Sequence, residues 1–257
     1  MRALGKEAYA EFFAHYRSSA SFSPIIGAVL EGTQKGLVFA LDEHAHDAAF
    51  VVHHFGFAHY IEVSKTLSFS ATLCAALIDS YMPSDIGKVV RCYAIPDEWL
   101  QPFAACEHIA VSERIRFEFI GQSAGNVAAR PVQPADMPRL ALLGLELGSR
   151  FWPSEEAFLQ QAKAQVVEEK GELVSLCYAA AVSGGKAEID IVTHPNHRGK
   201  GYAAQAAQAF IAQCVQSGLE PSWDCYSNNK ASIAVAKRLG FKESLHYPYA
   251  TIRLQAG

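Results

Sequence analysis

The sequence predicts an α/β protein, and three observations support this fold class. Strand-like runs of alternating or β-branched residues, such as residues 187–193, are followed by runs of helical composition, such as residues 202–216. Half of the 257 residues are hydrophobic and 19% are charged, so the chain can bury a sizeable core. Turns rich in glycine, as at residues 183–186, separate the runs.

The chain is long enough for one large domain or for two of ordinary size. A stretch of small residues at 121–126 lies between two strand-like runs, 115–120 and 127–131. We therefore expect a smaller α/β domain of unknown role at 1–122 and a second domain at 123–257. No internal repeat is visible in the sequence.

Periodicity and turn residues predict the individual elements. Asp136 and Ser154 are expected to cap the first two helices of the C-terminal domain. The N-terminal domain is expected to contain helices at 7–16 and 73–81 and strands at 37–41, 49–53 and 60–63. The C-terminal domain is expected to contain helices at 135–147, after Pro153, at 202–216 and at 227–239, and strands at 127–130, 164–168, 173–182, 187–193, 221–226 and 249–254.

Composition narrows the partners and the compartment. The formal net charge is -4 and no run of Lys and Arg stands out, which argues against nucleic acid. Apolar runs are far shorter than the ~20 residues that span a bilayer, and the charged first residues carry no secretory signal. Six cysteines lack any CxxC pair, which favours free thiols in a reducing compartment. We expect a cytoplasmic protein without a nucleic-acid or membrane partner, and the sequence does not predict its oligomeric state.

A group of histidines and aspartates in the N-terminal half has the composition of a metal site. No HxxxH or HExxH spacing accompanies it, so we predict no metal. The residues are His44, His46, His53, His54 and His59 with Asp42 and Asp47.

The turn Arg198-Gly199-Lys200-Gly201 links a strand-like run to a helix that begins near Tyr202. Such a turn presents unpaired backbone N–H groups and the positive end of the helix dipole, which bind phosphate. The P-loop and Rossmann signatures are both absent. On these residues alone, a plain strand-to-helix turn remains the alternative.

Neighbouring motifs extend the pattern. The spacing of Arg198, Gly201 and Ala203 resembles the Arg/Gln-x-x-Gly-x-Gly/Ala signature of the GNAT acyltransferase superfamily. Residues 127–136 resemble the first strand and first helix cap of that fold, and Asn229, eleven residues before Gly240-Phe241, resembles its second cofactor motif. The runs at 187–203 and 221–232 are similar to the subgroup of zwittermicin A self-resistance acetyltransferases, whose members carry an additional N-terminal α/β region.

The resemblance implies a C-terminal GNAT fold, with a mixed, mostly antiparallel sheet flanked by helices, and acetyl-CoA as co-substrate. Backbone N–H groups of the turn would hold the pyrophosphate, the strand before it the pantetheine arm, and a side chain of the next helix the cofactor. The implied cofactor-binding residues are Ile191, Val192, Thr193, Arg198, Gly199, Lys200, Gly201, Tyr202, Ala203, Ala204 and Asn229.

The same resemblance implies direct attack of an amine on the acetyl thioester, which requires a base. Glu188 is the first candidate and Asp190 the second, because strand alternation puts both on one face. Solvation at a cleft or structural pairing is the alternative for both. The position where the superfamily carries a tyrosine acid is Ala236, so that acid is missing; Tyr226 and Cys225 are substitutes that could equally be core residues.

Acceptor recognition is expected from the connection between the first two helices, where Arg150, Phe151 and Trp152 lie. An arginine with two aromatic rings can seat a polar amine, and a hydrophobic plug is the alternative. We predict an N-acetyltransferase that acts on a small-molecule amine. A non-catalytic acyl-CoA-binding or regulatory module and a protein or peptide N-acetyltransferase stay open. Antibiotic resistance is a candidate role only, because acceptor pockets vary on a shared fold.

Overall fold

The computed structural model describes residues 2–40, 46–64, 89–121, 128–143 and 151–253. The chain divides into two compact units of nearly equal length. Unit 1 comprises Met1–Ile115 and Leu245–Gly257, and unit 2 comprises Arg116–Ser244. This division differs from the expected domains at 1–122 and 123–257, because the end of the last strand pairs within the N-terminal unit. The N-terminal unit is nearly as long as unit 2 and not clearly the smaller one that was expected.

Unit 2 contains the elements expected for the C-terminal domain. In chain order they are β7 (Ala129–Pro131), α5 (Met137–Leu140), α7 (Glu155–Gln161), β8 (Gln165–Glu169), β9 (Glu172–Ser183), β10 (Lys186–Thr193), α8 (Tyr202–Gln216), β11 (Glu220–Tyr226), α9 (Lys230–Arg238) and the start of β12 (Phe241–Arg253). The strand order is β7-β8-β9-β10-β11, followed by β6 (Ile109–Phe119), which also begins in unit 1. Pairing is antiparallel up to β10, and β10 and β11 are parallel.

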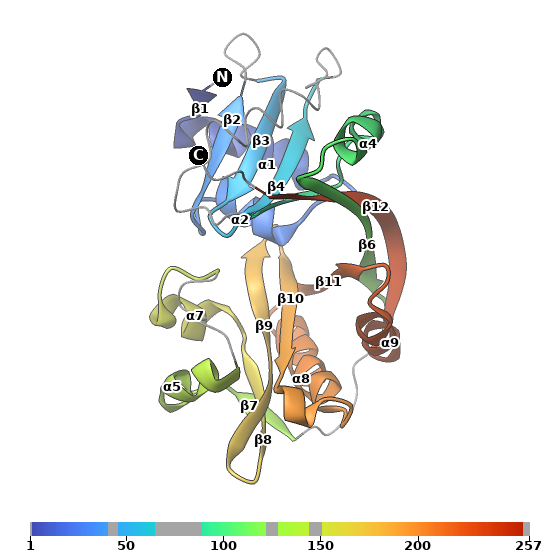
Figure 1. The fold of residues 1–257 in the computed structure, drawn as a ribbon. Helices are drawn as coiled ribbons and strands as arrows, with labels where there is room; N and C mark the ends of the chain where they lie inside the picture. The colour runs from blue at the N-terminus through green and yellow to red at the C-terminus, as the bar shows by residue number, and fades with distance from the viewer. Residues whose placement is uncertain (1, 41–45, 65–88, 122–127, 144–150, 254–257) are drawn as a thin grey trace. The chain divides into compact units, whose positions relative to one another are not determined.

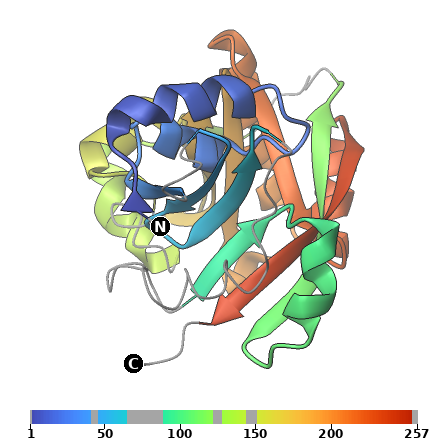
Figure 2. The same ribbon diagram turned by 90° about the horizontal axis from the view of Figure 1, so that it is seen from above.

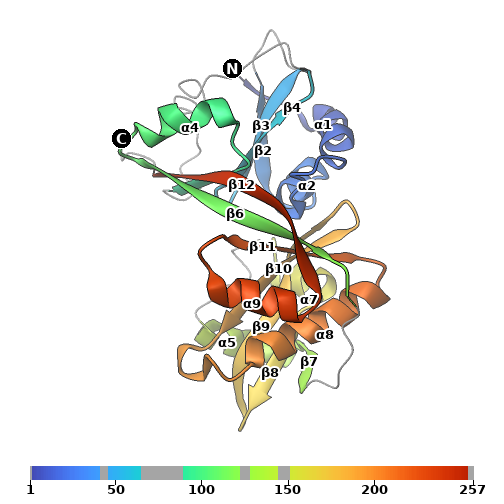
Figure 3. The same ribbon diagram turned by 90° about the vertical axis from the view of Figure 1, so that its right-hand side faces the viewer.

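Helices cover both faces of the unit 2 sheet. Helix α8 lies along one face of β9 and β10, and α5 and α7 lie on the other side (Figures 1 and 3). Phe210 and Ile211 of α8 are fully buried, as are Phe158 of α7 and Tyr178 of β9, whose rings meet edge to face. The long apolar strand β9 is thus the centre of the core.

Unit 1 is built in a similar way. Its elements are β1 (Arg2–Ala3), α1 (Tyr9–Tyr16), α2 (Pro24–Leu30), β2 (Gly36–Ala40), β3 (Ala48–His53), β4 (Phe57–Glu62), β5 (Val89–Tyr93), α4 (Asp97–Ala104), the start of β6 and the end of β12. The strand order is β1-β2-β3-β4-β5-β12, with β4 and β5 parallel and the other described pairs antiparallel. Helices α1 and α2 pack against the strands on one face (Figures 2 and 3).

The predicted elements are confirmed with shifted ends, and some were missed. Helix 202–216 agrees with α8, and Ser154 caps α7 by accepting the Ala157 N–H at 3.1 Å. Asp136 was expected to cap a helix at 135–147, but its carboxylate accepts the N–H of Gln133 and pairs with Arg130. Missed elements are β1, α2, α4, β5, the first half of β6 and the start of β12, which was expected only from residue 249. The expected helix 73–81 and most of the small-residue stretch 121–126 lie outside the described residues.

A close backbone contact explains the Gly240-Phe241 motif. Gly240 has φ +89°, and a Cβ placed on it would come within 2.8 Å of the Gly121 Cα. The carbonyl of Gly240 also accepts the Ile120 N–H at 2.9 Å. Phe241 is 3% exposed and packs on Trp223. The pair therefore ends α9 and anchors the next strand.

Two general features complete the description. Cys92, Cys106, Cys177, Cys214 and Cys225 are free thiols, and Cys74 lies outside the described residues. Within those described ranges, no helix has the length and apolar character needed to cross a membrane.

Candidate functional site

Strands β10 and β11 pair over only a short distance. Three residue pairs form the parallel ladder, from Lys186 with Glu220 to Glu188 with Ser222. On its other side β10 stays paired with β9 as far as Thr193. Within the described part of the chain, the β10 edge at 189–193 therefore has no ladder partner on the β11 side. Backbone groups along this edge can bind an extended ligand.

The turn after β10 forms an anion cradle at the start of α8. Gly201 is the N-cap residue with φ +84°, and it has no side chain to satisfy the first helical N–H groups. The first main-chain bond into the helix runs from the Gln205 N–H to the Gly201 carbonyl at 3.2 Å. A Cβ placed at Gly199 or Gly201 meets no atom within 4 Å. The N–H groups at the start of α8 have no partner within the helix, and no side chain of the described residues caps them.

The charges of the turn favour an anion. Arg198 and Lys200 are exposed, and the Arg198 Nε lies 3.4 Å from the Thr193 carbonyl, which it donates to. Glu169, at the end of β8, contacts two residues of the turn region. Its Oε2 lies 3.1 Å from His197 Nδ1 and 4.0 Å from Lys200 Nζ. A hydrogen bond from the Tyr202 hydroxyl holds the pKa of Glu169 below its usual value and raises that of Tyr202. No motif in the sequence indicated Glu169.

Glu188, the first candidate base, lies where the two strands begin to part. Its side chain is buried, and the residue is 5% exposed. The Ser222 hydroxyl, directly across the ladder, donates to Glu188 Oε2 at 3.0 Å. A buried carboxylate with a positioned hydroxyl donor is costly to keep unless it is used or fully hydrogen-bonded. Ser222 is the second residue of this site that the sequence did not indicate.

Asp190 and Tyr226, the other two candidates, differ in their surroundings. Asp190 Oδ2 accepts a hydrogen bond of 2.6 Å from Tyr178, its direct neighbour on β9. This contact fixes the carboxylate on the α7 side of the sheet, where the Tyr178 ring meets Phe158. Tyr226 is half-buried at the end of β11. Cys225 beside it is buried, which favours a core role for that thiol.

Asn229 has a clear structural role in addition to the cofactor role implied for it. It is the N-cap of α9, and its Oδ1 accepts the Ser232 N–H at 3.1 Å. This bond fixes the amide so that its NH2 end is the donor at an exposed position. Ala236, seven residues after Asn229 and at the position of the missing tyrosine, is fully buried.

The three predicted acceptor residues are not found together at a surface. Phe151 and Trp152 are each 3% exposed, and the Trp152 indole N–H donates to the Ala179 carbonyl at 2.8 Å. This placement favours the hydrophobic-plug alternative for both rings. Arg150 lies outside the described residues.

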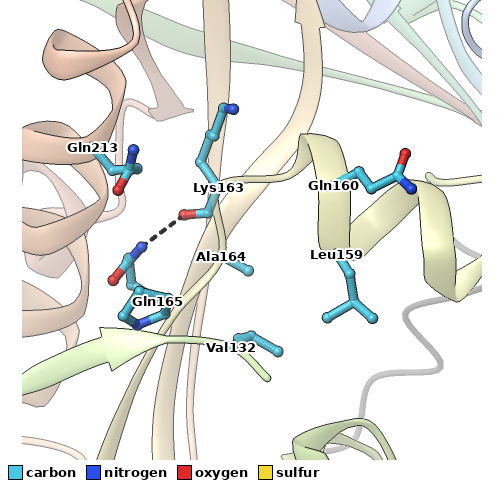
Figure 4. Close-up of a pocket in the computed structure, with 8 residues that line it drawn as sticks. Val132, Leu159, Gln160, Lys163, Ala164, Gln165 and Gln213 are labelled. Carbon is cyan, nitrogen blue, oxygen red and sulfur yellow. Dashed lines mark hydrogen bonds between the residues drawn. The ribbon is translucent and has the colours of Figure 1, made fainter. Parts of the chain in front are cut away.

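A separate hollow of about 210 Å³ lies near the other end of β8 (Figure 4). Gln213 of α8 and Gln160 of α7 line it, and Gln165 donates to the Lys163 carbonyl at 3.3 Å. Gln165 begins β8, whereas Glu169 at the cradle ends it. The hollow is therefore distinct from the anion cradle.

The N-terminal histidines have individual roles. His53 is fully buried, its Nδ1 accepts the Phe55 N–H, and its Nε2 lies 3.0 Å from Gln34 Oε1. Burial, reinforced by neighbouring His54, lowers the pKa of His53 to about 3. Among the described residues no three His, Cys, Asp or Glu side chains gather as a metal site, and His44 lies outside them.

Comparison with known proteins bears on this arrangement. Residues 140–250 match the family model described as GNAT acetyltransferase. A stretch of 97 residues is 38% identical to the "Uncharacterized N-acetyltransferase YdfB" of Bacillus subtilis (strain 168) and covers 38% of this chain and 37% of that protein. The match thus spans little more than a third of the relative's length.

Solved structures resemble the chain over nearly its whole length. A GCN5-related N-acetyltransferase-like protein from Streptococcus suis 89/1591 has a TM-score of 0.72 at 19% identity and covers 97% of this chain and 100% of that chain. A GCN5-related N-acetyltransferase from Sphaerobacter thermophilus has a TM-score of 0.64 at 14% identity, with 100% and 96% covered. At these identities the likeness shows the fold. Together, the family match and the fold support a GNAT acetyltransferase fold for the part of the chain around residues 140–250.

Proposed function

We propose that unit 2 transfers an acetyl group from acetyl-CoA to the primary amine of a small molecule. The observation that carries this proposal is the continuity of two features in residues 186–216. The β10 edge leaves β11 after Glu188, and the same segment ends in an uncapped helix N-terminus. An extended thioester arm and a pyrophosphate need these two features in this order.

The residues present fit acetyl-CoA. The N–H groups of residues 202–204 would hold the pyrophosphate, with Arg198 and Lys200 supplying positive charge. The edge at 191–193 would supply backbone groups to the pantetheine arm, and the Val192 N–H would support the thioester oxygen. The NH2 group of Asn229 would reach the cofactor from the start of α9. Bound acetyl-CoA supplies an activated acetyl group.

Glu188 acts as the general base in this proposal. An aliphatic amine has a pKa near ~10, so it must lose a proton before it attacks at neutral pH. Glu188 accepts that proton, directly or through a water, while the C–N bond forms and the C–S bond breaks. Ser222 positions the carboxylate. A thiol has a pKa near ~8.5, so the leaving thiolate needs little help from an acid. This chemistry is compatible with the buried Ala236.

The acceptor and the compartment belong to the proposal as well. The resemblance to the zwittermicin A resistance subgroup favours a small amine, an antibiotic among the candidates, over a protein. The net charge of -4 disfavours nucleic acid. Free thiols at the described cysteines fit a reducing cytoplasm.

Incubation of the protein with isotopically labelled acetyl-CoA and a metabolite extract tests the proposal. We expect mass spectrometry to find labelled acetyl groups on a small amine, and not with the Glu188→Gln variant. Label found only on peptides would favour a protein N-acetyltransferase. Tight binding of acetyl-CoA without any labelled product would favour a regulatory module, which the missing tyrosine acid also permits.

A further inference from the structure

The two units repeat one order of elements, although the sequence shows no repeat. From β1 to β6 the chain forms a strand, two helices (α1 and α2), three strands (β2 to β4), and then β5, α4 and β6. From β7 to β12 it forms a strand, two helices (α5 and α7), three strands (β8 to β10), and then β11, α9 and β12, with α8 between the parallel strands β10 and β11. The corresponding segment of unit 1, residues 65–88, lies outside the described residues. The strand pairings correspond as well: β4 pairs with β5 in parallel, and β10 pairs with β11 in parallel. Unit 1 is thus built on the acetyltransferase plan.

The last strands of the two repeats are exchanged. In unit 1 the neighbour of β5 is β12, and in unit 2 the neighbour of β11 is β6. Unit 1 therefore includes residues 245–253 of β12, and unit 2 includes the end of β6, residues 116–119. This exchange explains why the contact units do not follow a single cut in the chain.

The parallel ladders of the two repeats end at corresponding residues. Three pairs join β4 to β5, ending at His59 with Tyr93, just as three pairs join β10 to β11, ending at Glu188 with Ser222. His59 thus takes in unit 1 the place that Glu188 takes in unit 2. Beyond this point the strands of both units part.

A cavity of about 290 Å³ lies where β4 and β5 part. Its walls come from the end of β4, from residues after β5, and from the end of α1 with its connection to α2. Ligands of sheets with parallel strands bind at the carboxyl ends of such strands, where neighbouring strands diverge. The volume is near the lower end of small-molecule pockets, about 300–1,000 Å³. The lining residues that the argument uses are Tyr16, Ser19, His59, Ile61, Glu62 and Glu98.

The lining favours a cation with a short hydrocarbon part. Glu62 and Glu98 are exposed carboxylates, and no Lys or Arg belongs to this lining, all of which is described. The Tyr16 ring meets the His59 ring with centroids 4.9 Å apart, and Ile61 is buried beside them. The Tyr16 hydroxyl is held in place because it donates to the Ser21 carbonyl and accepts the Ser23 N–H. Carboxylates, ring faces and hydroxyl groups together bind ammonium groups.

We propose that this cavity of unit 1 binds a small organic ammonium ion. The proposal goes beyond the function of unit 2 and does not depend on acetyl transfer. It gives the N-terminal unit a ligand-binding role at the place that corresponds to the catalytic site of its partner repeat.

Binding measurements on the full chain test the proposal. The probes are butylamine and 1,4-diaminobutane, with butan-1-ol and butyrate as neutral and anionic counterparts, followed by saturation-transfer NMR and calorimetry. We expect both amines to bind and the two counterparts not to bind. In the double variant Glu62→Gln/Glu98→Gln, amine affinity should fall about tenfold, because charge-assisted hydrogen bonds are lost. The matched control Glu31→Gln/Glu107→Gln makes the same charge change at exposed sites outside the lining and should alter affinity less than twofold.

Three results would overturn the proposal. The first is an equal loss of amine affinity in both double variants, and the second is binding of butan-1-ol as strong as that of butylamine. The third is amine binding that falls with Glu188→Gln in unit 2 and not with Glu62→Gln/Glu98→Gln. In that third case the amine binds beside the proposed base of unit 2, so the inference fails while the proposed function stands.

Discussion

Two glycines with the same backbone conformation allow a matched test of the anion cradle. Gly201 at the cradle has φ +84°, and Gly185 in the β9–β10 turn has φ +80°. Both are exposed, and a Cβ at either position meets no atom within 4 Å. Gly185 precedes β10 and the cradle follows it, so the two lie at opposite ends of that strand. Replacing either glycine by Asp imposes the same left-handed strain, about 1 kcal/mol.

Only the Gly201→Asp variant places a carboxylate against a bound pyrophosphate. Unit charges about 4 Å apart repel by about 4 kcal/mol at an effective dielectric constant of about 20, and by about 1 kcal/mol in water. For the exposed start of α8 we take about 2 kcal/mol, which is about a thirtyfold increase in Kd. The Gly185→Asp variant should bind acetyl-CoA as the wild type does. Isothermal titration calorimetry with acetyl-CoA measures both, and thermal melts confirm equal stability losses.

Equal Kd values for the two variants would refute the cradle. The same conclusion would follow if Gly201→Asp bound acetyl-CoA as tightly as the wild type. If the equal Kd values reflect the same loss of affinity in both variants, the left-handed glycines act through stability alone.

Further predictions concern catalysis and stability. Ser222→Ala removes the donor that positions Glu188, so it should lower kcat several-fold and shift the pH profile of kcat. KM for acetyl-CoA should stay unchanged. An unaltered pH profile would argue against a positioning role for Ser222. Asp224→Ala removes the carboxylate that pairs with the buried Arg116 and should lower the free energy of unfolding in urea by about 3–5 kcal/mol. Glu220→Ala, which breaks an exposed pair with Lys186, should lower it by under about 1 kcal/mol. Equal losses would contradict the greater weight given to the buried pair. The folded pKa of His53, about 3, lies below its unfolded value, so the unfolded chain binds the proton more tightly. The contribution of His53 to the free energy of unfolding should therefore be fully present above about pH 6.5, and about 2 kcal/mol of it should be lost at pH 5. His53→Gln should flatten this slope, and a slope unchanged by the variant would contradict the assignment.

Regular periodicity made unit 2 predictable. Helix α8 combines buried alanines with Phe210 on one face, and β10 alternates, so both segments were expected close to their observed bounds. The buried helix α2, Pro24–Leu30, is apolar on all sides and shows no helical period. The first half of β6 is mostly exposed, so its strand character does not appear as alternation.

The site was predictable in its backbone and less so in its side chains. Glycine spacing in residues 198–201 indicated the cradle, because only glycine meets the left-handed requirement easily. Ser222, Glu169 and Tyr178 contact the candidate residues across strands far apart in sequence, and no local pattern reports such contacts. The aromatic rings of Phe151 and Trp152 would suit a substrate pocket, so the sequence could not exclude that role. Their burial in the structure favours a hydrophobic plug between helices.

The exchange of final strands could not be read from the sequence. Residues 250–253 continue the same strand that begins at Phe241, yet they pair with β5 of the N-terminal unit. Pairing partners of a long strand are set by tertiary contacts, and an alternating pattern alone does not distinguish between two sheets.

Release of free thiol from acetyl-CoA across a panel of small primary amines tests the central claim most directly. We expect amine-dependent thiol release by the wild-type protein. Glu188→Gln should reduce this release at least a hundredfold, because proton removal by a general base contributes about 10²–10⁴-fold. Tight acetyl-CoA binding with no thiol release on any amine would contradict the claim. Release that is equally fast in the Glu188→Gln variant would contradict the assignment of Glu188 as the base.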